Sequence, residues 1–159
     1  MVAAADLSPK PSVPPRVLIV DDDELVLRSL SRALSVAGMN VTAISDPCQA
    51  MSAVTADTFD AVLCDIRMPQ MSGLTLAQYV RSAYPDLPIM LMTGNPQLES
   101  AIECVHIGVQ EYLPKPIDAS KLRAAVSRAA KMSFTVIFSW PKASIPFSGW
   151  ARGARGAGA

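Results

Sequence analysis

The chain of 159 residues is 50% hydrophobic and 18% charged, a composition that supplies a core and excludes a chain disordered throughout. Its length is close to the usual size of one domain, about 100 to 150 residues. Fourteen basic residues balance fourteen acidic ones, so no overall field would draw the molecule onto nucleic acid or an anionic membrane. We therefore expect a single domain whose charge-dependent function is local.

The sequence shows no signal for secretion or membrane insertion. Residues 1–10 lack the apolar core of a signal peptide, and no run approaches the roughly 20 apolar residues that span a bilayer. The three cysteines, Cys48, Cys64 and Cys104, are odd in number and widely spaced, unlike those of disulfide scaffolds or zinc sites. A cytoplasmic location with no membrane partner is expected.

The expected domain follows a proline-rich segment. Residues 8–15 contain four prolines, which lack an amide donor and favour an extended, semi-rigid chain. We therefore expect residues 1–15 to form a disordered lead-in and one domain to occupy residues 16–132.

Within this domain, short apolar runs alternate with longer stretches of helical periodicity. The apolar runs are of strand length and lie at 17–20, 41–44, 61–64, 89–92 and, more weakly, 111–113. The stretches that follow them predict helices at 25–36, 47–56, 74–83, 96–107 and 118–131. The alternation is typical of β–α units, so the predicted fold class is α/β, a doubly wound parallel sheet of five strands with five helices.

Residue types that favour helix termini mark several of these boundaries. Short polar side chains cap helix starts, and glycine adopts the left-handed conformation that ends many helices. The expected starts are Ser72 or Gly73, Asn95 and Asp118, and the expected ends are Gly38 and Gly108.

Polar residues stand at the ends of four predicted strands. Asp21 and Asp22 follow the first strand, Asp65 the third, Thr93 the fourth and Lys115 the fifth. Functional groups of an open parallel sheet gather beyond the carboxyl ends of its strands. We therefore expect these five side chains to meet at one end of the sheet.

Three neighbouring carboxylates call for a cation. Asp21, Asp22 and Asp65 would repel one another and raise their own proton affinity unless a positive charge neutralised them. Ligands that are all oxygens, completed by a backbone carbonyl and water, suit a hard ion such as Mg²⁺. The sequence therefore predicts a magnesium site.

The same cluster predicts phosphoryl chemistry. A magnesium ion, an ammonium such as that of Lys115 and a hydroxyl such as that of Thr93 suit the oxygens of a transferring phosphoryl group, and one carboxylate could be the nucleophile. Asp65 is the best candidate, because it ends the central strand and is followed by Pro69 and Gly73, which indicate a structured loop.

Four segments in order resemble the receiver domain of bacterial two-component response regulators. They are Val-Leu-Ile-Val-Asp-Asp-Asp at 17–23, Asp-Ala-Val-Leu-Cys-Asp-Ile-Arg-Met-Pro at 60–69, Leu-Met-Thr-Gly at 91–94 and Tyr-Leu-Pro-Lys-Pro at 112–116. The resemblance covers about residues 16–131 and implies the flavodoxin-like fold of that family. It also implies a signalling domain that is not an enzyme, although it assists its own phosphorylation and dephosphorylation.

The resemblance assigns a role to each candidate residue. Asp65 would be the phosphoacceptor, and the ligands of the magnesium ion would be Asp21, Asp22, Asp65 and the backbone carbonyl of Arg67. Lys115 would bind the phosphoryl group, and Thr93 and Tyr112 would be the switch residues. Arg67 and Asn95 would tune the phosphorylated lifetime, and the bond between Lys115 and Pro116 would be cis. A tyrosine near a strand end also commonly just packs its ring, so the switch role of Tyr112 rests on the resemblance.

The resemblance also implies partners. A histidine kinase or a histidine phosphotransfer protein would supply the phosphoryl group. Phosphorylation would change binding to a downstream protein, which the sequence does not identify, through a surface around the fourth helix and fifth strand. A phosphorylation-dependent homodimer is a further expectation.

Two other interpretations fit parts of the pattern. Asp21, Asp22 and Asp23 resemble the Asp-x-Asp nucleophile motif of haloacid-dehalogenase-like phosphatases, but that family needs a further acidic pair after the lysine, and Asp118 is the only acid beyond Lys115. That interpretation also leaves Asp65 without a role. A degenerate receiver would act only as a protein-binding module, although every residue type that the chemistry requires is present.

The composition changes after residue 132. Residues 133–159 contain no acid, both tryptophans and three of the four phenylalanines. We expect an atypical, disordered tail, the product of a truncated or frame-shifted gene. A partner-binding or membrane-surface segment is the weaker alternative. This stretch is too short for a DNA-binding effector domain, so no direct nucleic acid binding is expected.

Overall fold

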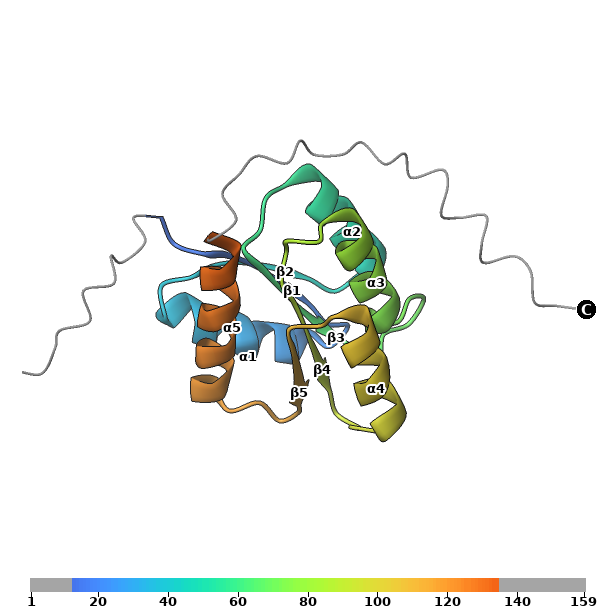
Figure 1. Cartoon of the computed structure of the whole chain (residues 1–159). Coiled ribbons are helices and arrows are strands. Elements are labelled where there is room, and N and C mark those ends of the chain that lie inside the picture. The colour runs from blue at the N-terminus through green and yellow to red at the C-terminus, as the bar shows by residue number, and fades with distance from the viewer. Residues whose placement is uncertain (1–12, 135–159) are drawn as a thin grey trace, which may run out of the picture.

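The computed structural model describes residues 13–134, which form one parallel sheet flanked by helices (Figure 1). The strands are β1 (Arg16–Val20), β2 (Asn40–Ile44), β3 (Ala61–Asp65), β4 (Ile89–Thr93) and β5 (Glu111–Pro114). The helices are α1 (Glu24–Val36), α2 (Pro47–Ala56), α3 (Gly73–Ala83), α4 (Leu98–Ile107) and α5 (Ala119–Phe134). The five strands run parallel in the order β2-β1-β3-β4-β5, and the predicted fold class is confirmed.

The structure does not test the predicted limits of the domain or the two predicted terminal segments. Most of the lead-in (1–15) and of the tail (133–159) lies outside the described residues, so both stay predictions. Among the helices of residues 13–134, none has the length and apolar character needed to cross a bilayer.

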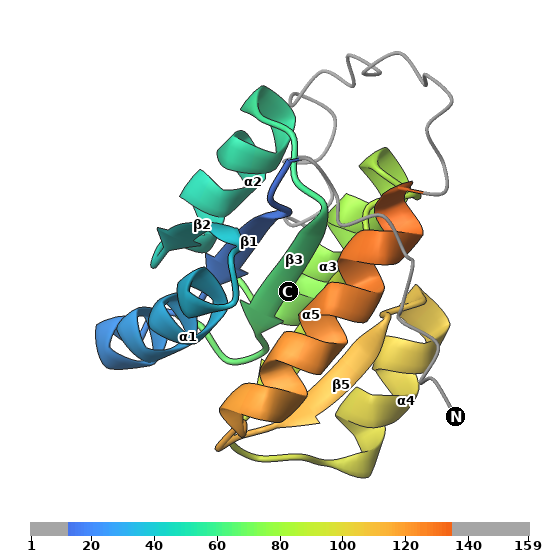
Figure 2. The same cartoon turned by 90° about the vertical axis from the view of Figure 1, so that its left-hand side faces the viewer.

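Two helical layers cover the two faces of the sheet. Helices α1 and α5 lie on one face, and α2, α3 and α4 lie on the other (Figures 1 and 2). Successive side chains of a strand point to opposite faces, so Ile19 packs with Leu34 and Val126 while Leu18 packs with Leu76. Each apolar run of the sequence therefore serves two cores.

The central strands of the sheet are completely buried. Every residue of β3 and of β4 is buried, whereas the edge strands β2 and β5 are partly exposed. Parallel strands that are covered on both faces are near-continuous apolar runs, which is why the sequence predicts β3 and β4 clearly and β5 weakly. The ends of β3 and β4 are thus held within the buried core.

Helix starts follow the capping residues at two of the three expected positions. Ser72 Oγ accepts the amide of Leu74 at 3.1 Å, and Asp118 Oδ2 accepts the amide of Ser120 at 3.0 Å. The expected start at Asn95 is wrong, because the Asn95 amide instead donates to Thr93 Oγ1 at 3.1 Å. Helix α4 begins at Leu98, without a side-chain cap.

Helix ends follow the glycines as expected. Gly38 and Gly108 both have positive φ, at 85° and 81°. In that region a side chain carrying Cβ is strained, and glycine is not. The α1 and α4 helices therefore end where the sequence predicts.

The layered core gives a stability prediction. Leu76 on α3 is fully buried, so Leu76→Ala should lower the free energy of unfolding by about 2–5 kcal/mol through lost burial and the cavity left behind. Leu98→Ala is the matched control, because Leu98 is 72% exposed, and its effect should be below about 0.5 kcal/mol. Urea unfolding followed by circular dichroism measures both, and equal losses would contradict this assignment of the core.

Candidate functional site

The carboxyl ends of three strands bring a lysine and two aspartates together. Lys115 follows β5, and its Nζ lies 2.7 Å from Asp21 Oδ2, just past β1, and 3.0 Å from Asp65 Oδ1, at the end of β3. Asp21 and Asp65 are almost completely buried, at 1% and 5% exposure. A single ammonium therefore bridges two buried carboxylates that lie 44 residues apart in the chain.

The ammonium is held in its charged form. Burial by itself lowers the pKa of Lys115, but the hydrogen bonds to Asp21 and Asp65 outweigh it and leave that pKa raised. A partly buried charge of this kind is tolerated because it is paired and hydrogen-bonded. Lys115 thus supplies a permanent positive charge at the site.

Asp65 experiences opposing influences. Burial raises its pKa, and the nearby charges of Asp21 and Asp22 raise it further, while the hydrogen bond from Lys115 lowers it. The net result is a pKa above the ordinary value for an aspartate. The Asp65 carboxylate is therefore an anion in a poorly solvated place, and it depends on the neighbouring cation.

Asp21 is oriented by the turn that leads into α1. Its Oδ1 accepts the amide of Asp23 at 2.9 Å while its Oδ2 accepts the ammonium of Lys115. Asp22, beside it, is exposed. The first strand thus offers one fixed carboxylate and one facing solvent.

The three aspartates fit a magnesium ion. One carboxylate oxygen from each of Asp21, Asp22 and Asp65 lies within 4.8 Å of the others. That spread suits an ion that bonds one or two carboxylates directly and reaches others through its waters. Arg67 lies two residues beyond Asp65 with an exposed side chain, and its carbonyl as a ligand stays a prediction.

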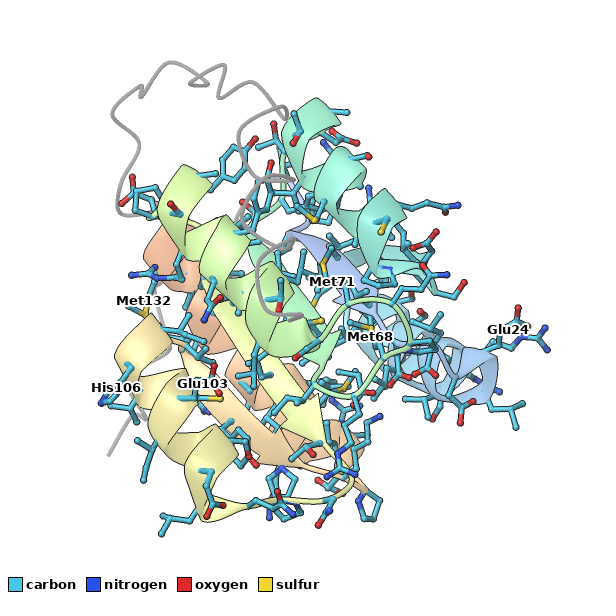
Figure 3. All side chains as sticks on the ribbon, turned by 90° about the vertical axis from the view of Figure 1, so that its right-hand side faces the viewer. Glu24, Met68, Met71, Glu103, His106 and Met132 are labelled. Carbon is cyan, nitrogen blue, oxygen red and sulfur yellow. The ribbon has the colours of Figure 1, made fainter. Side chains whose placement is uncertain are left out.

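The loop after β3 is built closely around Asp65. The Gly73 amide donates to the carbonyl of Ile66 at 2.8 Å, and a Cβ on Gly73 would collide with the backbone carbonyl of Asp65. Between them, Gln70 has a φ of 71°, a left-handed conformation that is costly for a residue other than glycine. Met68 and Met71 stand on the same loop (Figure 3) and pack against the core. The structured loop that Pro69 and Gly73 predict is therefore present.

Thr93 ends β4 next to this cluster. It is 2% exposed, and its carbonyl accepts the amide of Lys115 at 2.7 Å. Its hydroxyl accepts the amide of Asn95 at 3.1 Å. The Lys115–Pro116 peptide bond is cis, as the resemblance implies. Thr93 is thus tied through its backbone to the lysine of the site.

Tyr112 lies on β5, opposite Leu91 of β4, and is half-buried. Its hydroxyl lies 2.9 Å from Oγ of Ser100 on α4. Ser100 does not stand out in the sequence as a candidate site residue. The available signal is that Ser100 lies four residues before the buried Cys104, on the helix face directed at the sheet.

The two acids that a phosphatase would need have other partners. The carboxylate of Asp23 accepts the amides of Leu25 and Val26 and caps α1. Asp118 caps α5 in the same way, through the amides of Ser120 and Lys121. Both carboxylates are engaged as helix caps, which counts against the haloacid-dehalogenase interpretation.

The close approach at Gly73 gives a testable prediction. Gly73→Ala should displace Asp65 and lower the free energy of unfolding by about 1–3 kcal/mol, the usual range for overpacking. Gly94→Ala is the control on the other side of the site, since a Cβ there has no heavy atom within 4 Å. The unfolding free energies of both variants decide the matter, and a Gly73→Ala protein as stable as the control would contradict the contact.

Comparisons with known proteins agree with this geometry. Residues 17–127 match the family model of the response regulator receiver domain. The transcriptional regulator NtrC of Klebsiella pneumoniae is 40% identical over 111 residues, which are 70% of this chain and 24% of NtrC. The response regulator MprA of Mycolicibacterium vanbaalenii is 37% identical over 112 residues, 70% of this chain and 48% of MprA.

A solved structure shows the same arrangement. The receiver domain from Clostridium thermocellum superposes with a TM-score of 0.73 at 26% identity, covering 77% of this chain and 99% of that one. The chain spans about a quarter of the length of NtrC and about half of that of MprA. The family match covers more than half of the chain. The chain therefore belongs to the response regulator receiver domain family and has the phosphoacceptor role of that family in two-component signalling.

Proposed function

We propose that Asp65 is the residue that accepts the phosphoryl group. The observation that carries the proposal is the ammonium of Lys115, which lies within 3.0 Å of Asp65 and also bonds Asp21. Asp65 stands at the end of the central strand, which is buried along its whole length, and it is followed by a loop built around its carbonyl. Asp21 and Asp22 are then available to hold a cation.

The proposed reaction is a transfer between two residues. An oxygen of the Asp65 carboxylate forms a bond to the phosphorus of a phosphohistidine, and the bond from phosphorus to the imidazole nitrogen breaks. The electron pair of that bond leaves with the imidazole, which takes up a proton. Receiver domains of this family take the phosphoryl group from histidine kinases, so a histidine kinase or a histidine phosphotransfer protein is the proposed donor.

Asp21, Asp22, Asp65 and the carbonyl of Arg67 would hold the magnesium ion. When bound, magnesium would neutralise these carboxylates and stabilise negative charge on the phosphoryl oxygens. Lys115 would hold a further phosphoryl oxygen through its ammonium, and Thr93 would donate its hydroxyl to another. The acidic residues would thus bind the magnesium ion. The ammonium and the hydroxyl would orient the phosphoryl group that is transferred.

The other expectations from the sequence belong to the same proposed function. The protein would act as a signalling domain and not as an enzyme, in the cytoplasm, and its phosphorylated form would change its affinity for a downstream protein or form a homodimer. Direct binding to nucleic acid is not proposed, because the matched part covers only a quarter of the DNA-binding regulator NtrC. The comparisons do not favour a degenerate receiver, which would act only as a protein-binding module, and labelling of Asp65 would exclude it.

The central proposal predicts a loss of labelling in Asp65→Asn. Incubation with magnesium and acetyl phosphate should add one phosphoryl group to the unmodified protein and none to the variant, since the amide is a much weaker nucleophile. Asp86→Asn is the control, because Asp86 is exposed in the loop before β4, at the opposite end of the sheet. Intact mass and peptide mapping measure the label, and a label on Asp21 or continued labelling of Asp65→Asn would refute the assignment.

Lys115→Ala should slow labelling at least about tenfold. Removing one hydrogen bond to a charged group costs about 1.5–3 kcal/mol, and each 1.4 kcal/mol in a barrier corresponds to a factor of about ten. Lys121→Ala provides a matched loss of charge on the exposed surface of α5. Circular dichroism confirms that each variant is folded, and an unchanged initial rate in Lys115→Ala would show that its ammonium does not take part.

A further inference from the structure

Ser100 links the switch candidate Tyr112 to the start of α4. The two hydroxyl oxygens lie 2.9 Å apart, and Ser100 Oγ also donates to the carbonyl of Gln97 at 2.9 Å. A serine hydroxyl has one proton, so the hydroxyl of Tyr112 is the donor to Ser100 and that of Ser100 is the donor to Gln97. The bonds run in one direction from β5 to the first turn of α4.

That first turn has no other side-chain support at its start. Gln97, the residue before α4, makes no capping hydrogen bond with its side chain, and its carbonyl also accepts the amide of Ala101 at 3.1 Å. Helix starts leave several amides without intrahelical partners. The Ser100 hydroxyl donates to a carbonyl and so caps none of these amides, but it ties the Ser100 side chain to the backbone of a first turn that lacks a cap such as Asp23 on α1 or Ser72 on α3.

The other end of the link reaches the phosphoryl site. Tyr112 and Lys115 belong to the same segment, three residues apart, and the amide of Lys115 bonds the carbonyl of Thr93 at 2.7 Å. The ammonium of Lys115 contacts Asp65. A contiguous set of contacts thus runs from Asp65 through Lys115 and β5 to Tyr112, Ser100 and α4.

We propose that Ser100 is a positioning residue that couples Tyr112 to α4, so that a change of charge at Asp65 alters the first turn of that helix. The inference rests on the proposed function, since it takes phosphorylation of Asp65 as the input. Phosphorylation gives Lys115 new anionic oxygens to face, and Lys115 directly follows β5, the strand that carries Tyr112. The Tyr112–Ser100 bond then passes the displacement on.

The output surface is the exposed side of α4. Leu98, Ile102 and Val105 are exposed there, at 72%, 47% and 77%. Glu103 and His106 stand on the same helix and point to solvent (Figure 3). A change in the first turn of α4 therefore changes which of these groups a partner meets.

A single hydrogen bond can shift the equilibrium between two conformations of the first turn of α4 without making either one exclusive. The net contribution of one such bond corresponds to a factor of about two to ten in an equilibrium constant. Ser100 would therefore grade the response of α4 instead of creating it. Substitutions at Ser100 should change the size of the response while the phosphorylation chemistry at Asp65 continues.

The test compares the full chain with four variants: Ser100→Ala, Ser100→Thr, Tyr112→Phe and the double variant Ser100→Ala/Tyr112→Phe. Ser52→Ala is the matched control, because Ser52 is a helical serine whose hydroxyl bonds a backbone carbonyl on α2 and no tyrosine. Each protein is treated with magnesium and acetyl phosphate. Intact mass reports the label, and amide hydrogen exchange reports the first turn of α4 at Ala101. The ¹⁹F spectrum of fluorotyrosine-labelled protein, assigned with Tyr112→Phe, reports Tyr112.

The expected result is a selective loss of coupling. Ser100→Ala should be labelled at the unmodified rate, show a shifted Tyr112 resonance and exchange the Ala101 amide about fivefold faster before labelling. Its exchange should change on labelling by less than half as much as that of the unmodified protein. Tyr112→Phe and the double variant should show the same loss with no further addition, while Ser100→Thr restores the response and Ser52→Ala leaves it intact.

Two failures can be told apart. Absence of label on Asp65 in the unmodified protein would overturn the proposed function and this inference together. Normal labelling of Ser100→Ala with a full response of α4 would overturn the role of Ser100 alone. Additive effects of Ser100→Ala and Tyr112→Phe would also overturn it, since residues acting through one bond are not additive.

Discussion

The site depends on one partly buried ammonium shared by two buried carboxylates. Lys115 lies 2.7 Å from Asp21 and 3.0 Å from Asp65, and each of the three residues stands at the end of a different strand. Unpaired charges at these positions would be strongly unfavourable, so the geometry of the three strand ends has to be accurate. The register of β1, β3, β4 and β5 is therefore a condition for the chemistry as well as for the core.

The sheet provides that accuracy through burial. The same burial leaves the Asp65 carboxylate poorly solvated, and this favours its reaction. The β3 and β4 strands are buried along their whole length, which leaves little freedom to the residues at their ends. The same burial raises the pKa of Asp65, so that its carboxylate is less well solvated than one on the surface. Poor solvation of an anion beside a cation suits a nucleophile that must give up hydration before it reacts.

The parts of this structure that follow from local rules could be predicted from the sequence, and the parts that depend on side-chain contact across elements could not. Apolar runs identify the strands, because burial on both faces imposes a single pattern. The strand-end rule places Asp21, Asp65 and Lys115 at one end, because it needs only the topology. Asn95 was misassigned because its amide has a competing acceptor in Thr93, and Ser100 was missed because its importance depends on a tyrosine from a neighbouring strand.

Asp21 and Lys115, which form one ion pair, are held to different degrees. This difference decides which of the two moves when the charge at Asp65 changes. Asp21 is fully buried and also accepts the amide of Asp23 at the start of α1, so it is held from two sides. Lys115 follows the partly exposed edge strand β5, and its side chain is 22% exposed. When the charge at Asp65 changes, the less constrained partner is the one that adjusts. The structural reason for a response at β5 and α4 is therefore already present in the way that Asp21 is held.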